Sequence, residues 1–399
     1  MSSRPVDPVS NLRTLIQCPS VTPAEGGALD ALAAMLAPLK FEIERPVFTE
    51  AGTPDIENLY ARYGRTGPHL MFAGHTDVVP VGDDAVWSHP PFSADIQDGL
   101  MFGRGAVDMK GGIACFVAAL ARHLEANGTL PGSISFLITG DEEGPALNGS
   151  VKLLKWAAER GERWDACILG EPTNPEALGD MIKIGRRGSL SATVVIKGVQ
   201  GHVAYPHFAD NPVRSAVQMA TGLLSPSLDE GTPDFQPTNL EITSIDTGNS
   251  AVNVIPGKTT LSFNVRFNDL WTPDSLKREL ERRLERAAAM RTLHSGERKG
   301  SALYEVLWKE QPSQAFLTHD ETLIRIVKEA VAAVTGRSPA LSTSGGTSDA
   351  RFIKDYCPVV EFGLVGKTMH MVDENVAIED LETLTEIYGQ MIRNWFASK

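Results

Sequence analysis

The chain has 399 residues, enough for one large domain or two linked domains. Apolar residues make up 42% and charged residues 22%, which excludes a disordered chain and a coiled-coil rod. A formal net charge of −13 disfavours nucleic acid and anionic membranes as partners. The cysteines form no CxxC pair, the first ten residues carry no apolar signal core, and no run is long enough to span a membrane. We therefore expect a cytoplasmic protein.

Short apolar runs alternate with helical patterns in the first 170 residues. Buried strands are predicted over residues 70–73, 134–138 and 166–169, because each run ends in glycine or polar residues. Helices are predicted over residues 113–124 and 151–158, where apolar residues recur at helical spacing. This alternation favours an α/β fold with a largely parallel sheet.

The pattern changes near residue 185. Alternating, β-branched strands are predicted over residues 189–197 and 258–267, with a helix over residues 213–224 between them. A further amphipathic helix is marked by Leu276, Leu280 and Leu284. These elements indicate a smaller α+β domain.

The first pattern returns from Asp320 onward. A helix to Val334, a strand over residues 359–362 and a final helix containing Leu381 and Trp395 are predicted. We therefore expect a catalytic domain over residues 1–186 and 296–399, interrupted by an inserted domain over residues 187–295.

Acidic and histidine residues follow several of the predicted strands. They occur in GHTD (74–77), GDEEG (140–144) and GEPT (170–173), and ligands in open α/β sheets gather beyond the carboxyl ends of strands. Two further elements are GRGAVDMKGG (103–112), which opens a helix, and KTMH (367–370). Each element alone is more typical of a capped or solvated turn than of a site, and only the set predicts a shared site.

The set supplies two histidines and at least four carboxylates without a thiolate, which suits one or two divalent metal ions, zinc above all. His75 and Asp77 share a face of an extended segment, so Asp77 can accept the other ring N–H of His75. The adjacent Glu142 and Glu143 point in different directions. One can bind metal while the other serves as general base, as a metal hydrolase requires.

Taken together, GHTDVVP, GRGAVDMKGG, DEEG, GEPT and TMH resemble the M20 family of zinc-dependent amidohydrolases and exopeptidases, over nearly the whole chain. The resemblance implies an M20-type α/β catalytic domain with a mainly parallel sheet, interrupted by an inserted α+β dimerisation (lid) domain. The segments IKIGRRGSL, GVQGHVAYPH, NVIPG and SGGTSDARF resemble the succinyl-diaminopimelate desuccinylases of that family. This implies hydrolysis of N-succinyl-LL-2,6-diaminopimelate to succinate and LL-2,6-diaminopimelate, in lysine biosynthesis.

The resemblance also implies two zinc ions per subunit, with cobalt or manganese as substitutes. One ion would be held by His75, Asp108 and Glu171, and the other by Asp108, Glu143 and His370, with Asp108 bridging. Glu142 would be the general base that takes a proton from the metal-activated water, and Asp77 would orient His75. The peptide bond after Asp108 is expected to be cis.

In the family, the inserted domain forms a homodimer and supplies a histidine across the interface. His202 matches that histidine and would stabilise the oxyanion, with Asn253 assisting from the same side. The implied pocket for a small-molecule substrate contains Arg186, Arg187, Ser189, Tyr205, Thr347 and Ser348. Arginine grips a carboxylate through two hydrogen bonds, although two solvated arginines in a hinge are the alternative.

Other interpretations stay open. Gly366 stands where some members carry an asparagine, four residues before the last zinc histidine. Another M20 amide hydrolase, such as an acetylornithine deacetylase, would share the metal site but not this pocket. A non-catalytic metal-binding homologue would have no need of Glu142. The remaining histidines are expected to be structural or solvated: His69, His89, His123, His207, His294 and His319.

Overall fold

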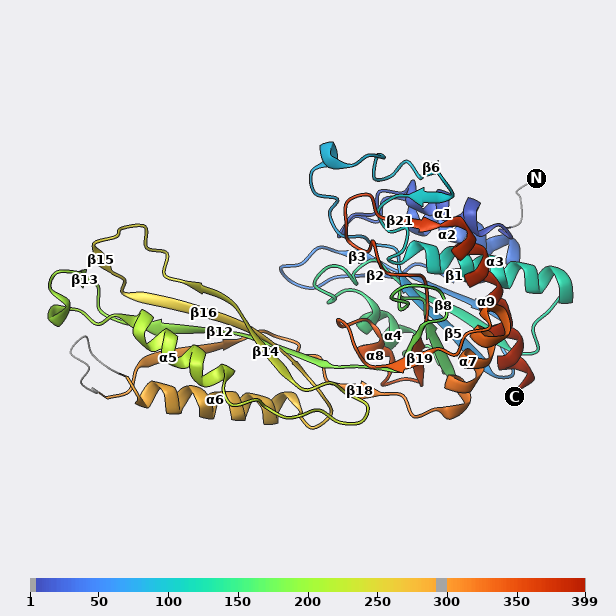
Figure 1. Ribbon diagram of the computed structural model, residues 1–399. Coiled ribbons are helices and arrows are strands. Elements are labelled where there is room, and N and C mark those ends of the chain that lie inside the picture. Colours follow the sequence, from blue (N-terminus) through green and yellow to red (C-terminus); the bar gives the residue numbers. More distant parts are fainter. Residues whose placement is uncertain (1–4, 292–299, 399) are drawn as a thin grey trace. The chain divides into compact units, whose positions relative to one another are not determined.

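The computed structural model describes residues 5–291 and 300–398, which form two compact units (Figure 1). Unit 1 contains the described residues up to Gly185, then Leu317–Ser342 and those from Ser348 onward. Unit 2 contains Arg186–Phe316 and Thr343–Thr347. Each unit is thus made of separate segments of the chain, and each is described by itself.

Unit 1 is built on an eight-stranded sheet. In spatial order, the strands are β1 (Glu42–Glu44), β4 (Leu59–Tyr63), β8 (Ser133–Thr139), β5 (His69–His75), β9 (Ala166–Leu169), β20 (Val359–Glu361), β10 (Met181–Lys183) and β19 (Ala340–Ser342). The four central strands β8, β5, β9 and β20 run parallel and are buried along their whole length. Continuous apolar runs of this kind are typical of a parallel sheet covered on both faces. The mainly parallel α/β fold is thus confirmed.

Helices cover both faces of this sheet (Figure 1). One layer contains α1 (Pro8–Ile16), α2 (Ala28–Leu36), α3 (Lys110–Asn127), α7 (Glu321–Thr335) and α9 (Ile378–Ala397), and the other contains α4 (Ser150–Glu159) and α8 (Ala350–Ile353). The rings of Phe72 on β5 and Phe116 on α3 stack with centroids 4.1 Å apart. A Cβ atom on Gly112 would lie 2.4 Å from the carbonyl oxygen of Gly170. Glycine here allows the start of α3 to lie against the end of β9.

Unit 2 is an antiparallel four-stranded sheet in the order β14 (Asn239–Asp246), β16 (Lys258–Phe267), β12 (Gly188–Lys197) and β17 (Leu303–Trp308). Helices α5 (Pro212–Leu224) and α6 (Pro273–Ala289) pack on one another, and α5 also contacts three of the strands. Leu276, Leu280 and Leu284 form the buried face of α6, as predicted. A separate short pair, β13 (Gly201–His202) and β15 (Val254–Ile255), follows β12.

The inserted unit is longer than the sequence suggested. It begins at Arg186 and continues to Phe316, well beyond the expected end at residue 295, because β17 pairs with β12 and completes the sheet. Thr343–Thr347 also belongs to unit 2. His294 and the expected boundary between residues 295 and 296 lie outside the described residues.

The remaining elements are short. They are η1 (Ala37–Leu39), β2 (Val47–Phe48), β3 (Ile56–Glu57), η2 (Asp84–Val86), β6 (Ile96–Gln97), β7 (Leu100–Phe102), β11 (Gly185–Arg186), η3 (Pro206–Phe208), β18 (Phe316–Leu317) and β21 (Asn375–Ala377). None of the helices in the described ranges has the length and apolarity that a membrane crossing requires.

Candidate metal centre

The acidic and histidine motifs of unit 1 converge at one edge of its sheet. His75 is the last residue of β5, Glu142 and Glu143 follow β8, and Glu171 follows β9. Because these strands are parallel and adjacent, their carboxyl ends meet at the same edge. Asp108 comes from the segment that leads into α3, and His370 from the loop after β20. The predicted convergence is therefore present.

One set of ligating atoms surrounds His75. Its Nε2 lies 3.2 Å from Asp108 Oδ1 and 3.7 Å from Glu171 Oε1. The other ring nitrogen, Nδ1, lies 2.8 Å from the carbonyl oxygen of Asp77. A carbonyl only accepts, so Nδ1 donates to it and Nε2 is the ring nitrogen that faces the two carboxylates. Glu171 Oε1 is buried and takes no hydrogen bond among the described residues, as expected of an oxygen that a cation satisfies.

A second set shares the other oxygen of Asp108. His370 Nε2 lies 3.1 Å from Asp108 Oδ2 and 2.9 Å from Glu143 Oε1. Metal–ligand bonds of about 2.0–2.2 Å place neighbouring ligands of a tetrahedral ion about 3.3–3.6 Å apart. The spacings in both sets are close to this value, and ligating atoms of His75, Asp108 and Glu143 all lie within 4.8 Å of one another. One imidazole with two carboxylates per set fits zinc, cobalt or manganese.

The electrostatics of the cluster point the same way. Burial, and then the neighbouring Asp108, raise the pKa of Glu171 well above its ordinary value. Burial opposes the charged form of His75, but Asp108, Glu171 and Asp77 outweigh it and raise its pKa. The Asp108 and Glu143 carboxylates raise the pKa of His370 to about 10. So many buried carboxylates facing two imidazoles form a strongly anionic site that divalent cations would neutralise.

Asp77 differs from the sequence-based expectation. Its carboxylate Oδ1 lies 3.6 Å from His75 Nδ1, and the hydrogen bond goes to the Asp77 backbone carbonyl instead. The carboxylate accepts the backbone N–H groups of Glu142 at 3.2 Å and Glu143 at 3.0 Å. Asp77 therefore orients His75 through its main chain and holds the paired glutamates through its side chain.

The Glu142 carboxylate takes part in neither ligand set. Burial raises its pKa well above the ordinary value; His75 opposes this shift, and the buried Asp349 adds to it. The residue lies beside the cluster because its backbone is tied to Asp77. Its side chain is thus an acidic group near the cluster that is in neither ligand set.

Three backbone positions in unit 1 bear on the site: the peptide bond after Asp108, Gly366 and His370. The Asp108–Met109 peptide bond is cis, as the resemblance implied. A Cβ atom on Gly366 would have its nearest neighbour 3.6 Å away, on Pro172, so the glycine there is not required by crowding. His370 has a φ of +62°, which is uncommon for a residue other than glycine and is typical of functional sites.

The predicted substrate residues of unit 2 fall into two groups. Arg186 ends β11, Arg187 leads into β12, and Ser189 is the second residue of β12. Arg186 Nη1 donates to the carbonyl of Gly346 beside Thr347 (3.1 Å). The second group is His202, Tyr205 and Asn253, which lie beyond the other end of β12 at the β13–β15 pair. The ten residues of β12 span about 30 Å, so Tyr205 lies with His202 and away from the arginines.

Several predicted side chains have partners within their own unit. Ser348 in unit 1 is buried and donates to Glu361 Oε1 at 2.6 Å, which commits its hydroxyl to the interior. Arg187 Nη1 donates to Asn239 Oδ1 at 2.9 Å, and Ser189 Oγ accepts from Asn264 at 3.2 Å. Arg187 and Ser189 of the first group therefore already belong to a polar network within unit 2.

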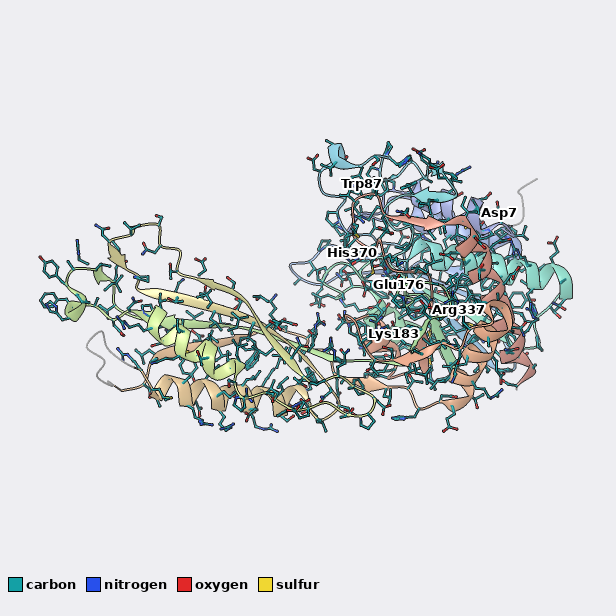
Figure 2. All side chains as sticks on the ribbon, in the orientation of Figure 1. Asp7, Trp87, Glu176, Lys183, Arg337 and His370 are labelled. Atoms are coloured by element: carbon teal, nitrogen blue, oxygen red, sulfur yellow. The ribbon has the colours of Figure 1, made fainter. Side chains whose placement is uncertain are left out.

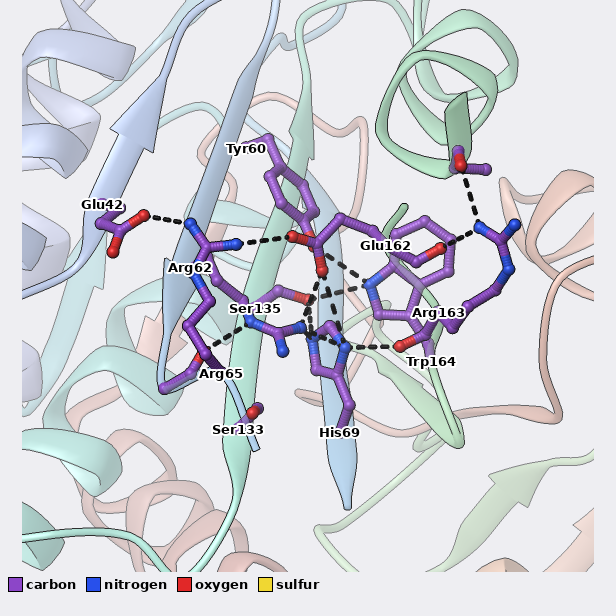
Figure 3. A network of polar contacts seen from close by, with 12 residues as sticks. Glu42, Tyr60, Arg62, Arg65, His69, Ser133, Ser135, Glu162, Arg163 and Trp164 are labelled. Carbon is purple, nitrogen blue, oxygen red and sulfur yellow. Dashed lines mark hydrogen bonds and ion pairs between the residues drawn. The ribbon is translucent and has the colours of Figure 1, made fainter. Parts of the chain in front are cut away.

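His69, expected to be structural, lies in a buried polar network far along β5 from the metal cluster (Figure 3). Its Nδ1 donates to the Arg163 carbonyl at 2.6 Å, and its Nε2 accepts from Ser135 at 2.9 Å. Arg62 contacts the ring and pairs with Glu162 at 2.8 Å. Since His69 and His75 are the first and last residues of the same strand, His69 has no part in the metal site.

The sequence reasoning missed two buried residues that contact the cluster's own loops, Arg104 and Glu374. Arg104 lies inside the GRGAVDMKGG motif, and Glu374 lies four residues after His370. Their nearness in sequence to the predicted ligands Asp108 and His370 is the signal that could have revealed them.

The comparisons with known proteins agree with this geometry. A family model described as peptidase family M20/M25/M40 matches residues 71–394. The M20 family metallo-carboxypeptidase Sso-CP2 from Sulfolobus solfataricus is 17% identical, with a TM-score of 0.77 over 98% of this chain and 99% of that chain. A tripeptidase from Staphylococcus aureus is 21% identical, with a TM-score of 0.77 over 99% of both chains.

A third similar structure is the YXEP protein from Bacillus subtilis, described as a dinuclear metal binding peptidase from the M20 family. It is 17% identical, with a TM-score of 0.69 over 98% of both chains. At these identities the structures show a shared fold, and the family model covers most of the chain, including every residue of both ligand sets. The chain belongs to peptidase family M20/M25/M40.

Proposed function

We propose that this M20 family protein is a two-metal amide hydrolase that converts N-succinyl-LL-2,6-diaminopimelate to succinate and LL-2,6-diaminopimelate. The observation that carries the hydrolase proposal is the pair of ligand sets sharing Asp108, with Glu142 beside both and belonging to neither. The description of the YXEP protein as a dinuclear metal binding peptidase supports two metal ions here. The succinyl substrate rests on the motif resemblance.

The chain's residues divide the work as follows. His75, Asp108 and Glu171 would hold one ion, and Asp108, Glu143 and His370 the other. When bound, divalent ions polarise an amide carbonyl and lower the pKa of a coordinated water. Glu142 accepts a proton from the attacking water at its carboxylate and delivers it to the nitrogen of the breaking C–N bond, so that the amine leaves neutral.

The arginines at the start of β12 support an anionic substrate. Arg186 is buried and donates to the carbonyl of Gly346, in the loop that also contains Thr347. A guanidinium binds a carboxylate through two parallel hydrogen bonds, and the proposed substrate carries three carboxylates. The local positive charge of Arg186 and Arg187 thus serves recognition although the chain as a whole is acidic.

The two groups in unit 2 support a homodimer. About 30 Å of strand separates Arg187 from His202, too far for one unit 2 to bring both to the same small substrate. We therefore propose that His202, with Asn253 and Tyr205 beside it, acts in the site of a second subunit. There the imidazole would donate to the developing oxyanion, a contribution worth several kcal/mol.

The test is a substrate panel with zinc-reconstituted protein: N-succinyl-LL-2,6-diaminopimelate, N-acetyl-L-ornithine and an unblocked tripeptide. We expect kcat/KM to favour the succinyl substrate by at least about 100-fold. Glu142→Gln should lower kcat by about 10²–10⁴-fold with the metal content unchanged. Preference for the acetyl substrate or the tripeptide would keep the hydrolase and overturn the substrate. Full activity in Glu142→Gln would overturn the assignment of the base.

A further inference from the structure

Glu374 is a buried carboxylate that belongs to neither ligand set. It lies four residues beyond His370 and is fully inaccessible to solvent. Its Oε1 accepts the backbone N–H groups of Val107 at 3.0 Å and Asp108 at 3.3 Å, and its Oε2 accepts from Arg104 Nη1 at 2.8 Å. Both oxygens of Glu374 are thus directed at the segment that carries the shared ligand Asp108.

Arg104 completes the connection from the other side. Besides Glu374, its Nη1 donates to the carbonyl of Met371 at 3.0 Å, directly after His370. Its guanidinium carbon lies 5.1 Å from the centre of the Trp87 ring, which covers it, and its side chain is 3% exposed. Figure 2 shows Trp87 and His370 on the same side of unit 1. A buried Arg–Glu pair, called here the Arg104–Glu374 pair, therefore joins two loops more than 260 residues apart in sequence.

The strands beneath these loops explain the meeting point. β7 ends at Phe102 and β21 begins at Asn375, and these two residues are partners in an antiparallel pair. Gly103 N donates to the Glu374 carbonyl at 2.8 Å, which extends the pairing by one step. Beyond this step, the contacts of the Arg104–Glu374 pair continue to join the two segments toward Asp108 and His370.

The two ligand sets depend on this pair to different degrees. The His75 side chain is 1% exposed, and its orientation is fixed by β5 and by the Asp77 carbonyl. The His370 side chain is 45% exposed, and its backbone has a φ of +62°. Core packing therefore positions His75, whereas His370 sits on a loop whose attachment to the Asp108 segment runs through Arg104 and Glu374.

We propose that Arg104 and Glu374 are positioning residues that keep Asp108 and His370 at the spacing required by the metal ion they share. The proposal rests on the metal centre of the proposed function and deepens it. Because Asp108 belongs to both sets, the pair bears on both, but it bears most on the set of Asp108, Glu143 and His370, since core packing holds His75 in the other set. Hydrogen-bonded supports of this kind typically change metal affinity by about 10- to 100-fold.

The experiment is a titration of the full-length, metal-depleted protein with Co²⁺, followed by its visible absorption and by bound-metal analysis. In Glu374→Gln and Arg104→Lys we expect one of the two Co²⁺ equivalents to bind about 10- to 100-fold more weakly, and the other to be weakened by a clearly smaller factor because it shares only Asp108 with the affected set. Glu374→Gln keeps the shape and one acceptor oxygen, and Arg104→Lys keeps the charge. Either variant suffices if the other fails to fold.

Glu162→Gln is the matched control. Glu162 also pairs with a buried arginine of unit 1, at 2.8 Å, but in the His69 network away from the ligands (Figure 3). This variant should lose stability while both Co²⁺ equivalents bind normally. Unchanged binding in the Arg104 and Glu374 variants, or equal weakening of both equivalents in them, would overturn the proposal. A wild-type protein that binds two Co²⁺ yet hydrolyses no succinyl substrate would refute only the proposed substrate.

Discussion

The buried His69 should make unit 1 sensitive to mild acid. In the folded chain both ring nitrogens are engaged, Nδ1 with the Arg163 carbonyl and Nε2 with the Ser135 hydroxyl (Figure 3). Burial, and then the adjacent Arg62, lower the pKa of His69 to about 4. Between these pKa values, His69 is therefore neutral in the folded chain and protonated in the unfolded chain.

The size of the effect follows from the two pKa values. An unfolded histidine titrates near 6.5, so between about pH 7 and pH 4 the unfolded state binds more protons and stability falls as the pH falls. With a folded pKa of about 4, the loss is about 2 kcal/mol between pH 7 and pH 5. It approaches about 3 kcal/mol once the pH is below the folded pKa, where the loss stops growing.

The assay is urea unfolding of wild type and His69→Gln at pH 7 and pH 5. EDTA is present throughout, so that metal release does not contribute. Glutamine keeps a donor and an acceptor for the network but does not titrate. We expect the variant to lose about 2 kcal/mol less than the wild type over this interval. His319→Gln, at an exposed position, controls for the removal of one histidine. Equal losses in wild type and His69→Gln would refute the reasoning.

Four further outcomes are expected. Asp77→Asn removes one of the acceptors for the paired glutamate amides and should lower kcat about 10- to 100-fold without unfolding; full activity would contradict this. Mixing inactive His202→Ala and Glu142→Gln subunits should restore about a quarter of wild-type activity, since half the dimers carry one intact site, whereas no recovery would place His202 in its own subunit's site. Gly112→Ala puts a Cβ atom 2.4 Å from a backbone oxygen and should lower the unfolding free energy by about 1–3 kcal/mol. Gly366→Ala, with 3.6 Å of room, should stay within about 0.5 kcal/mol of the wild type.

Long, patterned elements of the fold could be predicted from the sequence, and short ones could not. The strands over residues 166–169 and 258–267 and the helix with Leu276, Leu280 and Leu284 were all confirmed. Strand β17 was missed because Leu303–Trp308 is apolar at every position except Glu305, so its sequence does not show the alternation that its burial shows. Helix α1 was not predicted, although its start signal is present in the sequence, since Asp7 caps it and Pro8 follows.

The candidate site shows a similar division. The strand-end rule was enough to bring His75, Glu142 and Glu171 together, because parallel neighbours share an edge. It could not say which oxygen of Asp77 meets His75, since residue spacing places a residue on a face but does not choose between its carbonyl and its carboxylate. Nor could it pair Arg104 with Glu374, whose contact depends on the β7–β21 pairing.

The order of strands in the sheet of unit 1 has a consequence for synthesis on the ribosome. β20 lies between β9 and β10, although Val359 emerges long after Leu169. At 5–20 residues per second, about 10–40 s pass before β9 receives its second neighbour. During that time the inserted unit's continuous stretch, Arg186–Phe316, is already complete, while the apolar edge of β9 stays unpaired. The continuous stretch of unit 2 can therefore fold before the sheet of unit 1 is complete. Until β20 has been translated, one edge of β9 has no neighbouring strand and can pair with other chains.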